Sequence, residues 1–191
     1  MTDGTLAIQQ RWAAVAAECL LRPLDARWRH VLGVVAQAGR VAASLPDGER
    51  PWLVAAAYLH DVGYASELVQ TGSHAVDGAL WLRGWGRERL ARLVAHHSEA
   101  RFEADIRCLG GAIAAFNRED SPTADALTYC DLTTGPTGVR VTVEQRIADI
   151  EARYPPGHFV RAALLLSLPS LLDAVRRTEA RIAHAGLAAL R

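Results

Sequence analysis

The fold of this chain is decided by one stretch of sequence, PWLVAAAYLHD at residues 51–61. A helix of this sequence is apolar on every side until its last two residues, and such a helix belongs in the centre of a protein. Pro51 suits the first turn of a helix, and we expect Gly63 to end it. The stretch therefore predicts a buried central helix that ends on His60 and Asp61.

The segments on both sides of this stretch also have helical periodicity, and strict alternation of polar and apolar residues is almost absent. Turn signals lie at residues 46–48, 84–86, 133–138 and 155–157. Pro169 is expected to kink or restart the last helix. No repeat or interdomain linker interrupts the pattern. The chain is predicted to be all-α, one compact helical bundle over residues 1–191, with helices at 5–20, 24–44, 51–61, 73–83, 87–97, 108–116, 121–132, 142–153 and 159–187.

The composition excludes several classes of protein. Half of the 191 residues are hydrophobic and 22% are charged, which argues against disorder. Because 21 basic residues balance 21 acidic ones, no partner is expected among nucleic acid polymers or anionic membranes. No apolar stretch is long enough to span a bilayer, and the N-terminus lacks the basic start of a signal peptide, so a cytoplasmic location is expected. Three widely spaced cysteines, Cys19, Cys108 and Cys130, are expected to be small buried side chains.

All 21 basic residues are arginine, and the chain contains no lysine. Asp61 stands at the C-terminal end of the central helix, where the helix dipole disfavours an anion by about 0.3–1 kcal/mol. Burial of this carboxylate adds a much larger cost unless a cation lies beside it. We therefore expect either an arginine or a metal ion next to Asp61.

Other polar residues also interrupt apolar stripes on the expected helices. Asp131 follows Ala124, Leu127 and Thr128 at helical spacing, and His97 continues a similar stripe. Each one alone is explained by a hydrogen-bonded core histidine or by an ion pair with arginine. Together they favour a site for Mn, Fe, Co, Ni or Zn built from facing helices. The residues concerned are His30, His60, Asp61, His74, His96, His97 and Asp131.

The order His30, His60-Asp61, His74, His96-His97, Asp131 resembles the HD-domain superfamily of metal-dependent phosphohydrolases. The resemblance covers residues 24–135 and implies an all-helical metal-site core there, with C-terminal helices at 142–189 packed on it. It implies a first divalent ion held by His30, His60, Asp61 and Asp131. Asp61 would bridge to a second ion held by His74 and by His96, His97 or both. His74 has an alternative role as a phosphate contact.

The resemblance also implies a reaction. A hydroxide bridging two metal ions would attack a small phosphate ester, with a nucleotide as the expected substrate, in a phosphomonoesterase or a phosphodiesterase. Asp61 and Glu67 are the candidate catalytic residues, although a solvated loop glutamate is an equal alternative for Glu67. Arg101 and Arg140 are candidate substrate-binding residues. Arg27, Arg29 and Arg146 are similar candidates, and surface ion pairs are the alternative for all five arginines.

Two other functions remain open. Mixed-valent diiron oxygenases have the same six ligands, four histidines and two aspartates, on the same scaffold, so ligand identity does not separate an oxygenase from a hydrolase. A non-catalytic binding module is a third reading, and the intact His30, His60, Asp61 and Asp131 speak against it. The apolar segment Leu164–Leu172 either packs within the domain or forms a homodimer face.

Overall fold

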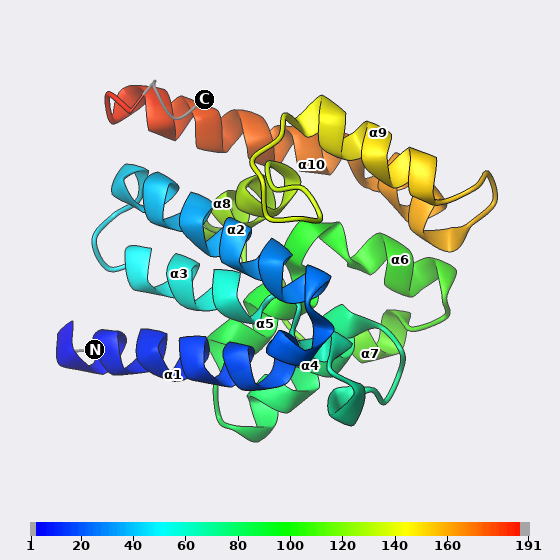
Figure 1. The fold of residues 1–191 in the computed structure, drawn as a ribbon, viewed down its shortest axis with the longest axis horizontal. Coiled ribbons are helices and arrows are strands. Elements are labelled where there is room, and N and C mark those ends of the chain that lie inside the picture. The colour runs from blue at the N-terminus through cyan, green and yellow to red at the C-terminus, as the bar shows by residue number, and fades with distance from the viewer. Residues whose placement is uncertain (1–2, 188–191) are drawn as a thin grey trace.

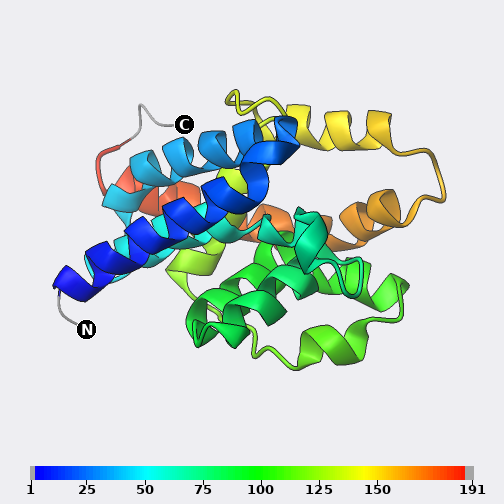
Figure 2. The same ribbon diagram turned by 60° about the horizontal axis from the view of Figure 1, so that its bottom comes forward.

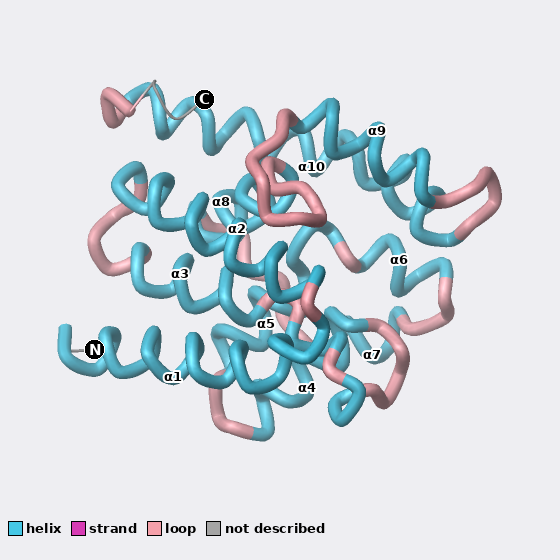
Figure 3. Tube along the Cα trace, in the orientation of Figure 1, coloured by secondary structure: helices cyan, strands magenta, loops and turns pink. Residues whose placement is uncertain are grey.

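The computed structural model describes residues 3–187 of the chain. Every regular element in that range is helical (Figure 3), and β-type pairing of the backbone is limited to one isolated bridge between Thr134 and Arg140. The predicted all-α class is therefore confirmed. Residues 188 and 189, which the expected C-terminal unit includes, lie outside the described range.

The helices largely follow the expected segments. The long ones are α1 (Asp3–Leu21), α2 (Ala26–Val41), α3 (Arg50–Leu59), α4 (His74–Gly84), α5 (Glu88–His96), α8 (Pro122–Leu132), α9 (Val143–Arg153) and α10 (Phe159–His184). Two shorter helices are α6 (Arg101–Ile106), which the sequence pattern did not predict, and α7 (Gly110–Ala114). Short 3-10 turns are η1 (Arg22–Leu24), η2 (Ala42–Ser44), η3 (Val62–Tyr64), η4 (Ser66–Leu68) and η5 (His97–Glu99). The expected restart at Pro169 does not occur, because α10 continues through this exposed proline.

Helix α3 occupies the centre, as its sequence predicts. It packs between α1 and α2, and α5 and α8 also contact it (Figure 1). The alanines at 55, 56 and 57 are fully buried, and their small side chains let neighbouring helices approach closely. The helix ends at Leu59, before the expected position, so His60 and Asp61 lie where the chain leaves the core.

Gly63 has a different role from the expected one. Its backbone is not left-handed, so it is no C-terminal cap for α3. A Cβ atom at this position would overlap the carbonyl oxygen of His74 and the backbone nitrogen of Gly78. Glycine is therefore needed so that η3 can pack directly on α4, which brings the start of α4 next to Asp61.

Helix α8 begins where its sequence predicts. Pro122 lies in its first turn, and Ser121 Oγ accepts a hydrogen bond from the backbone N–H of Ala124 at 3.2 Å. The helix contacts α2, α3, η5 and α10, so Asp131 near its end lies in the middle of the molecule. Helices α9 and α10 lie along one side of the bundle (Figure 1), and the turn that joins them is seen at the right in Figure 2.

The expectation for the cysteines is wrong in two cases out of three. Cys130 is buried in α8, but Cys19 and Cys108 are exposed. Cys19 lies on the outer face of α1, and Cys108 lies in a left-handed turn with φ 59° after α6. Among the described residues, no helix is long and apolar enough to cross a membrane.

Candidate metal centre

Six histidine and aspartate side chains from five parts of the chain come together in one cluster. They form two groups, and within each group the possible ligand atoms lie within 4.8 Å of one another. The first group is His30, His60 and Asp131, and the second is Asp61, His74 and His97.

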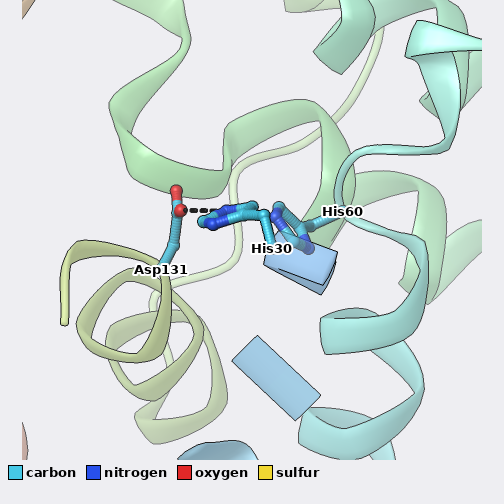
Figure 4. A group of neighbouring side chains, drawn as sticks. All are labelled: His30, His60 and Asp131. Carbon is cyan, nitrogen blue, oxygen red and sulfur yellow. Dashed lines mark hydrogen bonds and ion pairs between the residues drawn. The ribbon is translucent and has the colours of Figure 1, made fainter. Parts of the chain in front are cut away.

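In the first group the two histidines are buried and Asp131 is half-buried, and the rings are held in a fixed orientation (Figure 4). His30 Nε2 lies 3.0 Å from Asp131 Oδ1, and the opposite ring nitrogen donates to the carbonyl of Gly135 at 3.0 Å. His60 Nδ1 donates in the same way to the carbonyl of Ala57 at 2.9 Å. Because Nδ1 carries the proton in both rings, the neutral form directs the Nε2 lone pair inward.

The loop after α8 supplies the carbonyl that orients His30. Gly138 has φ 81°, and a Cβ atom there would overlap the carbonyl oxygen of Arg29. A Cβ atom at Gly33 would in turn overlap the backbone of Gly138. The two glycines therefore let this loop lie directly on α2, next to His30.

The second group contains two buried side chains, Asp61 and His97, and one partly exposed histidine, His74. Asp61 Oδ1 lies 3.6 Å from His74 Nε2 and 3.9 Å from His97 Nε2, and the two Nε2 atoms are 3.3 Å apart. His97 Nδ1 donates to the carbonyl of Val94 at 2.6 Å. His74 has no such carbonyl partner among the described residues, and its ring stacks on the exposed Tyr64 with centroids 4.2 Å apart.

Asp61 lies between the two groups. Its Oδ2 is 3.3 Å from His60 Nε2 and 3.9 Å from His30 Nε2, whereas its Oδ1 faces the second group. Arg27 Nη1 donates to Asp61 Oδ2 at 2.7 Å. The expected cation beside Asp61 is therefore an arginine, and the same carboxylate also belongs to a group of possible metal ligands.

The charges of the centre suit a cation. Burial raises the pKa of Asp61, but Arg27 and His60 outweigh it and hold that pKa well below its usual range. Burial also raises the pKa of Asp131, but a hydrogen bond and the positive charge of His30, when that ring is protonated, hold the pKa well below its usual range. Burial lowers the pKa of His74 to about 3, whereas at His60 the charge of Asp61 outweighs burial and raises the pKa. Ionised carboxylates and neutral imidazoles are the forms that bind metal ions.

The hydrogen bonding of the centre tests whether these residues fit a metal. His60 Nε2 is buried and has no hydrogen-bond partner in the part of the chain that the structure describes. His30 Nε2 and Asp131 Oδ1 face each other as two acceptors when Nδ1 carries the ring proton. Buried acceptors without a donor are unfavourable, and a shared cation satisfies both. The six side chains therefore fit divalent metal ions.

A strained turn completes the centre. Ser98 and Glu99 both have left-handed backbones, with φ 48° and 57°, which costs about 1–3 kcal/mol for each residue. The turn places Ser98 Oγ 2.5 Å from Asp131 Oδ2, to which it donates. Glu99 is buried and accepts from Arg101 Nε at 2.7 Å and from Arg118 Nη2 at 2.6 Å. No signal in the sequence singled out Ser98.

The structure does not bring every candidate residue to the centre. His96 donates from Nε2 to the carbonyl of Phe116 at 2.7 Å, so His97 is the member of the pair that faces the cluster. Glu67 is exposed in η4 and accepts from Ser66, Arg101 is bound to Glu99, and Arg140 lines a separate groove beside Tyr129.

A cavity of about 290 Å³ opens from the centre. Two of the five candidate arginines line it, namely Arg27 and Arg146. Arg146 is 9% exposed, and its Nη2 lies 4.0 Å from Asp131 Oδ1. Arg29 instead pairs with Asp25 on the surface. The cations at this cavity thus come from α2 and α9.

Comparison with known proteins gives one match. A family model described as "HD domain" matches residues 27–150, which is more than half of the chain. No curated protein and no solved structure matches. The matched range contains all six side chains of the two groups, and also Arg27 and Arg146.

Proposed function

This chain belongs to the HD-domain family, a superfamily of the metal-dependent phosphohydrolase type, and we propose that it hydrolyses a small phosphate ester. The observation that carries the proposal is the position of Asp61, with one oxygen toward each ligand group. A carboxylate placed in this way can bridge two cations, as the centres of two-metal phosphatases require.

We assign the divalent ions to the two groups. His30, His60 and Asp131 would hold one ion and His74 and His97 the other, with Asp61 shared between them. Bound divalent ions supply Lewis-acid stabilisation of charge on the phosphoryl oxygens and lower the pKa of a water molecule. Imidazole and carboxylate ligands suit Fe, Mn, Co, Ni or Zn.

Arg27 and Arg146 would bind the phosphoryl oxygens. Both line the cavity, and each lies beside one of the two aspartates. Arg27 Nη1 donates to Asp61 Oδ2 at 2.7 Å, and a cation bound in the first group would compete with this arginine for the carboxylate. The planar guanidinium then presents paired N–H donors that match a phosphate.

The chain also restricts what can reach the centre. Residues of α9 and α10 form part of the cavity wall, and the cavity volume is near the lower limit for small-ligand pockets. This size supports a small-molecule substrate, such as a nucleotide or another phosphate monoester, and not a nucleic acid polymer.

A mixed-valent diiron oxygenase is the second candidate. The four histidines and two aspartates that the structure brings together are also the ligands that the oxygenases of this scaffold share. The two candidates use the same side chains and differ in the redox chemistry of the ions.

The test is release of phosphate after the protein has been stripped with a chelator and reloaded with Mn²⁺, Co²⁺, Zn²⁺ or Fe²⁺. We expect metal-dependent release from at least one phosphate monoester in a panel of nucleotides and simple esters. Asp61→Asn is expected to abolish release, because the carboxylate shared by both groups is lost. Asp47→Asn is the matched control, since the side chain of Asp47 is 91% exposed and remote from the cavity.

Three results would count against phosphate ester hydrolysis: no release with any of the metals, equal release in the chelated protein, or full activity in Asp61→Asn. A mixed-valent iron EPR signal with oxygen consumption would favour the oxygenase. Absence of bound metal would favour a binding module.

A further inference from the structure

The ring of Tyr64 lies between two side chains that the proposed function uses. Its centroid is 4.0 Å from the guanidinium carbon of Arg27 and 4.2 Å from the centroid of the His74 ring, with 13° between the planes of the two rings. A guanidinium and an imidazole cannot both lie over one face of a ring at these distances, because they would overlap. Arg27 therefore stacks on one face of Tyr64 and His74 on the other.

The local fold brings these three side chains together. Arg27 lies in α2 and His74 is the first residue of α4, whereas Tyr64 ends η3. Because Gly63 has no Cβ atom, η3 lies directly on α4, and the side chain of the next residue reaches His74. Tyr64 is exposed, lines the cavity and lies outside the hydrophobic core of the described residues. Its ring therefore belongs to the wall of the cavity and not to the packing of the core.

Asp61 contacts the same two residues through its carboxylate oxygens. Arg27 Nη1 donates to Asp61 Oδ2 at 2.7 Å, and His74 Nε2 lies 3.6 Å from Asp61 Oδ1. A cation in the first group would compete with Arg27 for this carboxylate, whereas the stack on Tyr64 involves neither oxygen. The negative face of an aromatic ring attracts a guanidinium, and an imidazole stacks well on the opposite face. The ring can therefore hold Arg27 in place while the carboxylate binds cations.

We propose that Tyr64 is a positioning residue that holds Arg27 and His74 with the two faces of its ring. It would keep the guanidinium and the imidazole in the orientations that a phosphoryl group and the second ion require, without touching the reacting atoms. The inference rests on the proposed function for the role of Arg27. Because the faces of the ring produce the effect, the hydroxyl group of Tyr64 is not required. Loss of the ring should weaken the binding of phosphate and of one metal ion together.

The test compares Tyr64→Leu, which has no ring, with Tyr64→Phe, which keeps the ring and lacks the hydroxyl group. Calorimetry would measure binding of Mn²⁺, and then binding of inorganic phosphate to protein saturated with Mn²⁺. The Mn²⁺ step that His74→Ala abolishes identifies the ion of the second group. We expect Tyr64→Leu to weaken that step and phosphate binding by about fivefold each, with the other Mn²⁺ step unchanged. Tyr64→Phe should keep all three affinities within about twofold of wild type.

A double-mutant cycle with Arg27→Gln separates positioning from a general structural effect. If Tyr64 acts on phosphate through Arg27, Tyr64→Leu should cost less than about twofold in phosphate affinity once Arg27 has been replaced. Val69→Ala is the matched control, because Val69 lies in the same segment, is exposed and does not line the cavity. Circular dichroism melting checks that each variant folds. Tyr64→Gln, whose polar side chain suits the exposed position, takes the place of Tyr64→Leu if the latter does not fold.

The inference is overturned if a folded Tyr64→Leu protein keeps both affinities, if Tyr64→Phe loses as much as Tyr64→Leu, or if Tyr64→Leu costs as much in the Arg27→Gln background as in wild type. These outcomes concern binding and are independent of the proposed hydrolysis. The expected binding losses without release of phosphate from any ester would contradict the proposed function alone. Release of phosphate with no effect of Tyr64→Leu on binding would contradict only the inference about Tyr64.

Discussion

The two ligand groups differ in how firmly the protein holds them. In the first group, both histidines donate to backbone carbonyls, and the side chains of His30 and His60 are at most 2% exposed. In the second group, His74 is 19% exposed and is oriented by stacking on the exposed Tyr64. Because a preorganised site loses less entropy on binding, we expect the first group to bind its ion more tightly than the second.

The largest effects are expected from removing one histidine of each group. His60→Ala should lower kcat/KM for phosphate release by about a thousandfold, equivalent to about 4 kcal/mol, because the tightly held ion is lost. His74→Ala should keep that ion, and its kcat/KM for phosphate release should fall by only about 10–100-fold. Metal analysis of the purified variants together with kinetics checks both expectations. Equal losses, or a larger loss in His74→Ala, would remove the distinction between the groups.

Substitution of the glycine that supports the first group should destabilise the fold. Gly138→Ala forces a side chain into a left-handed backbone and against Arg29, so we expect a loss of about 2–4 kcal/mol in the free energy of unfolding. Gly39→Ala is the control, since a Cβ atom there meets nothing within 4 Å and alanine favours a helix by about 0.5–1 kcal/mol. Urea denaturation measures both. A Gly138→Ala protein as stable as wild type would mean that the loop has room to move away from α2.

Ser98 provides a finer test of the first group. Ser98→Ala removes the hydrogen bond to Asp131 Oδ2, and loss of such a supporting bond typically weakens metal binding by about 10–100-fold. The exposed Ser66→Ala serves as control. Titration with Mn²⁺ should show weaker binding of the tighter ion in Ser98→Ala and an unchanged weaker ion. Weakening of both ions to the same degree would contradict the assignment of Ser98 to one group.

The smallest effect concerns the attachment of α8, which carries Asp131, to α10. Burial raises the pKa of Asp125, but hydrogen bonds from Arg177 and Arg181 lower it below the ordinary value of 3.8. A carboxyl group with a lowered folded-state pKa contributes stability above its unfolded pKa, and this contribution is lost as the pH falls through the folded value.

At pH 7, Asp125→Asn should therefore be less stable than wild type by about 1–2 kcal/mol. The difference should shrink as the pH is lowered below 3.8 toward the folded-state pKa. Urea denaturation of both proteins at pH 7, 5 and 3 measures it. A difference that stays constant over this range would show that the charge of Asp125 is not responsible.

The hydrophobic periodicity of the sequence predicts much of the fold, but it predicts the residues of the candidate metal centre only in part. Apolar stripes place α3 in the core and turn Asp131 and His97 inward, because helical spacing determines which side of a helix a residue occupies. Helical spacing could not predict which of the candidate arginines line the cavity. Arg146 reaches the centre because α9 folds back over it, and Arg140 is directed elsewhere by the loop on α2.

Local backbone geometry accounts for the remaining differences. The role of Ser98 depends on two consecutive left-handed residues, and no spacing rule predicts such a strained turn. His96 and His97 are adjacent in sequence, and the end of α5 between them decides which one faces the cluster. The need for glycine at position 63 depends on its contact with α4, a neighbour that the sequence pattern alone does not identify.

The central claim is that Asp61 joins two groups of metal ligands. Metal content and calorimetric Mn²⁺ binding of wild-type protein and Asp61→Asn, measured under the same conditions, test it most directly. We predict two ions per chain in the wild type, bound in a tighter and a weaker step, and at most one weakly bound ion in Asp61→Asn. Two ions retained in Asp61→Asn, or a single binding step in the wild type, would contradict the claim.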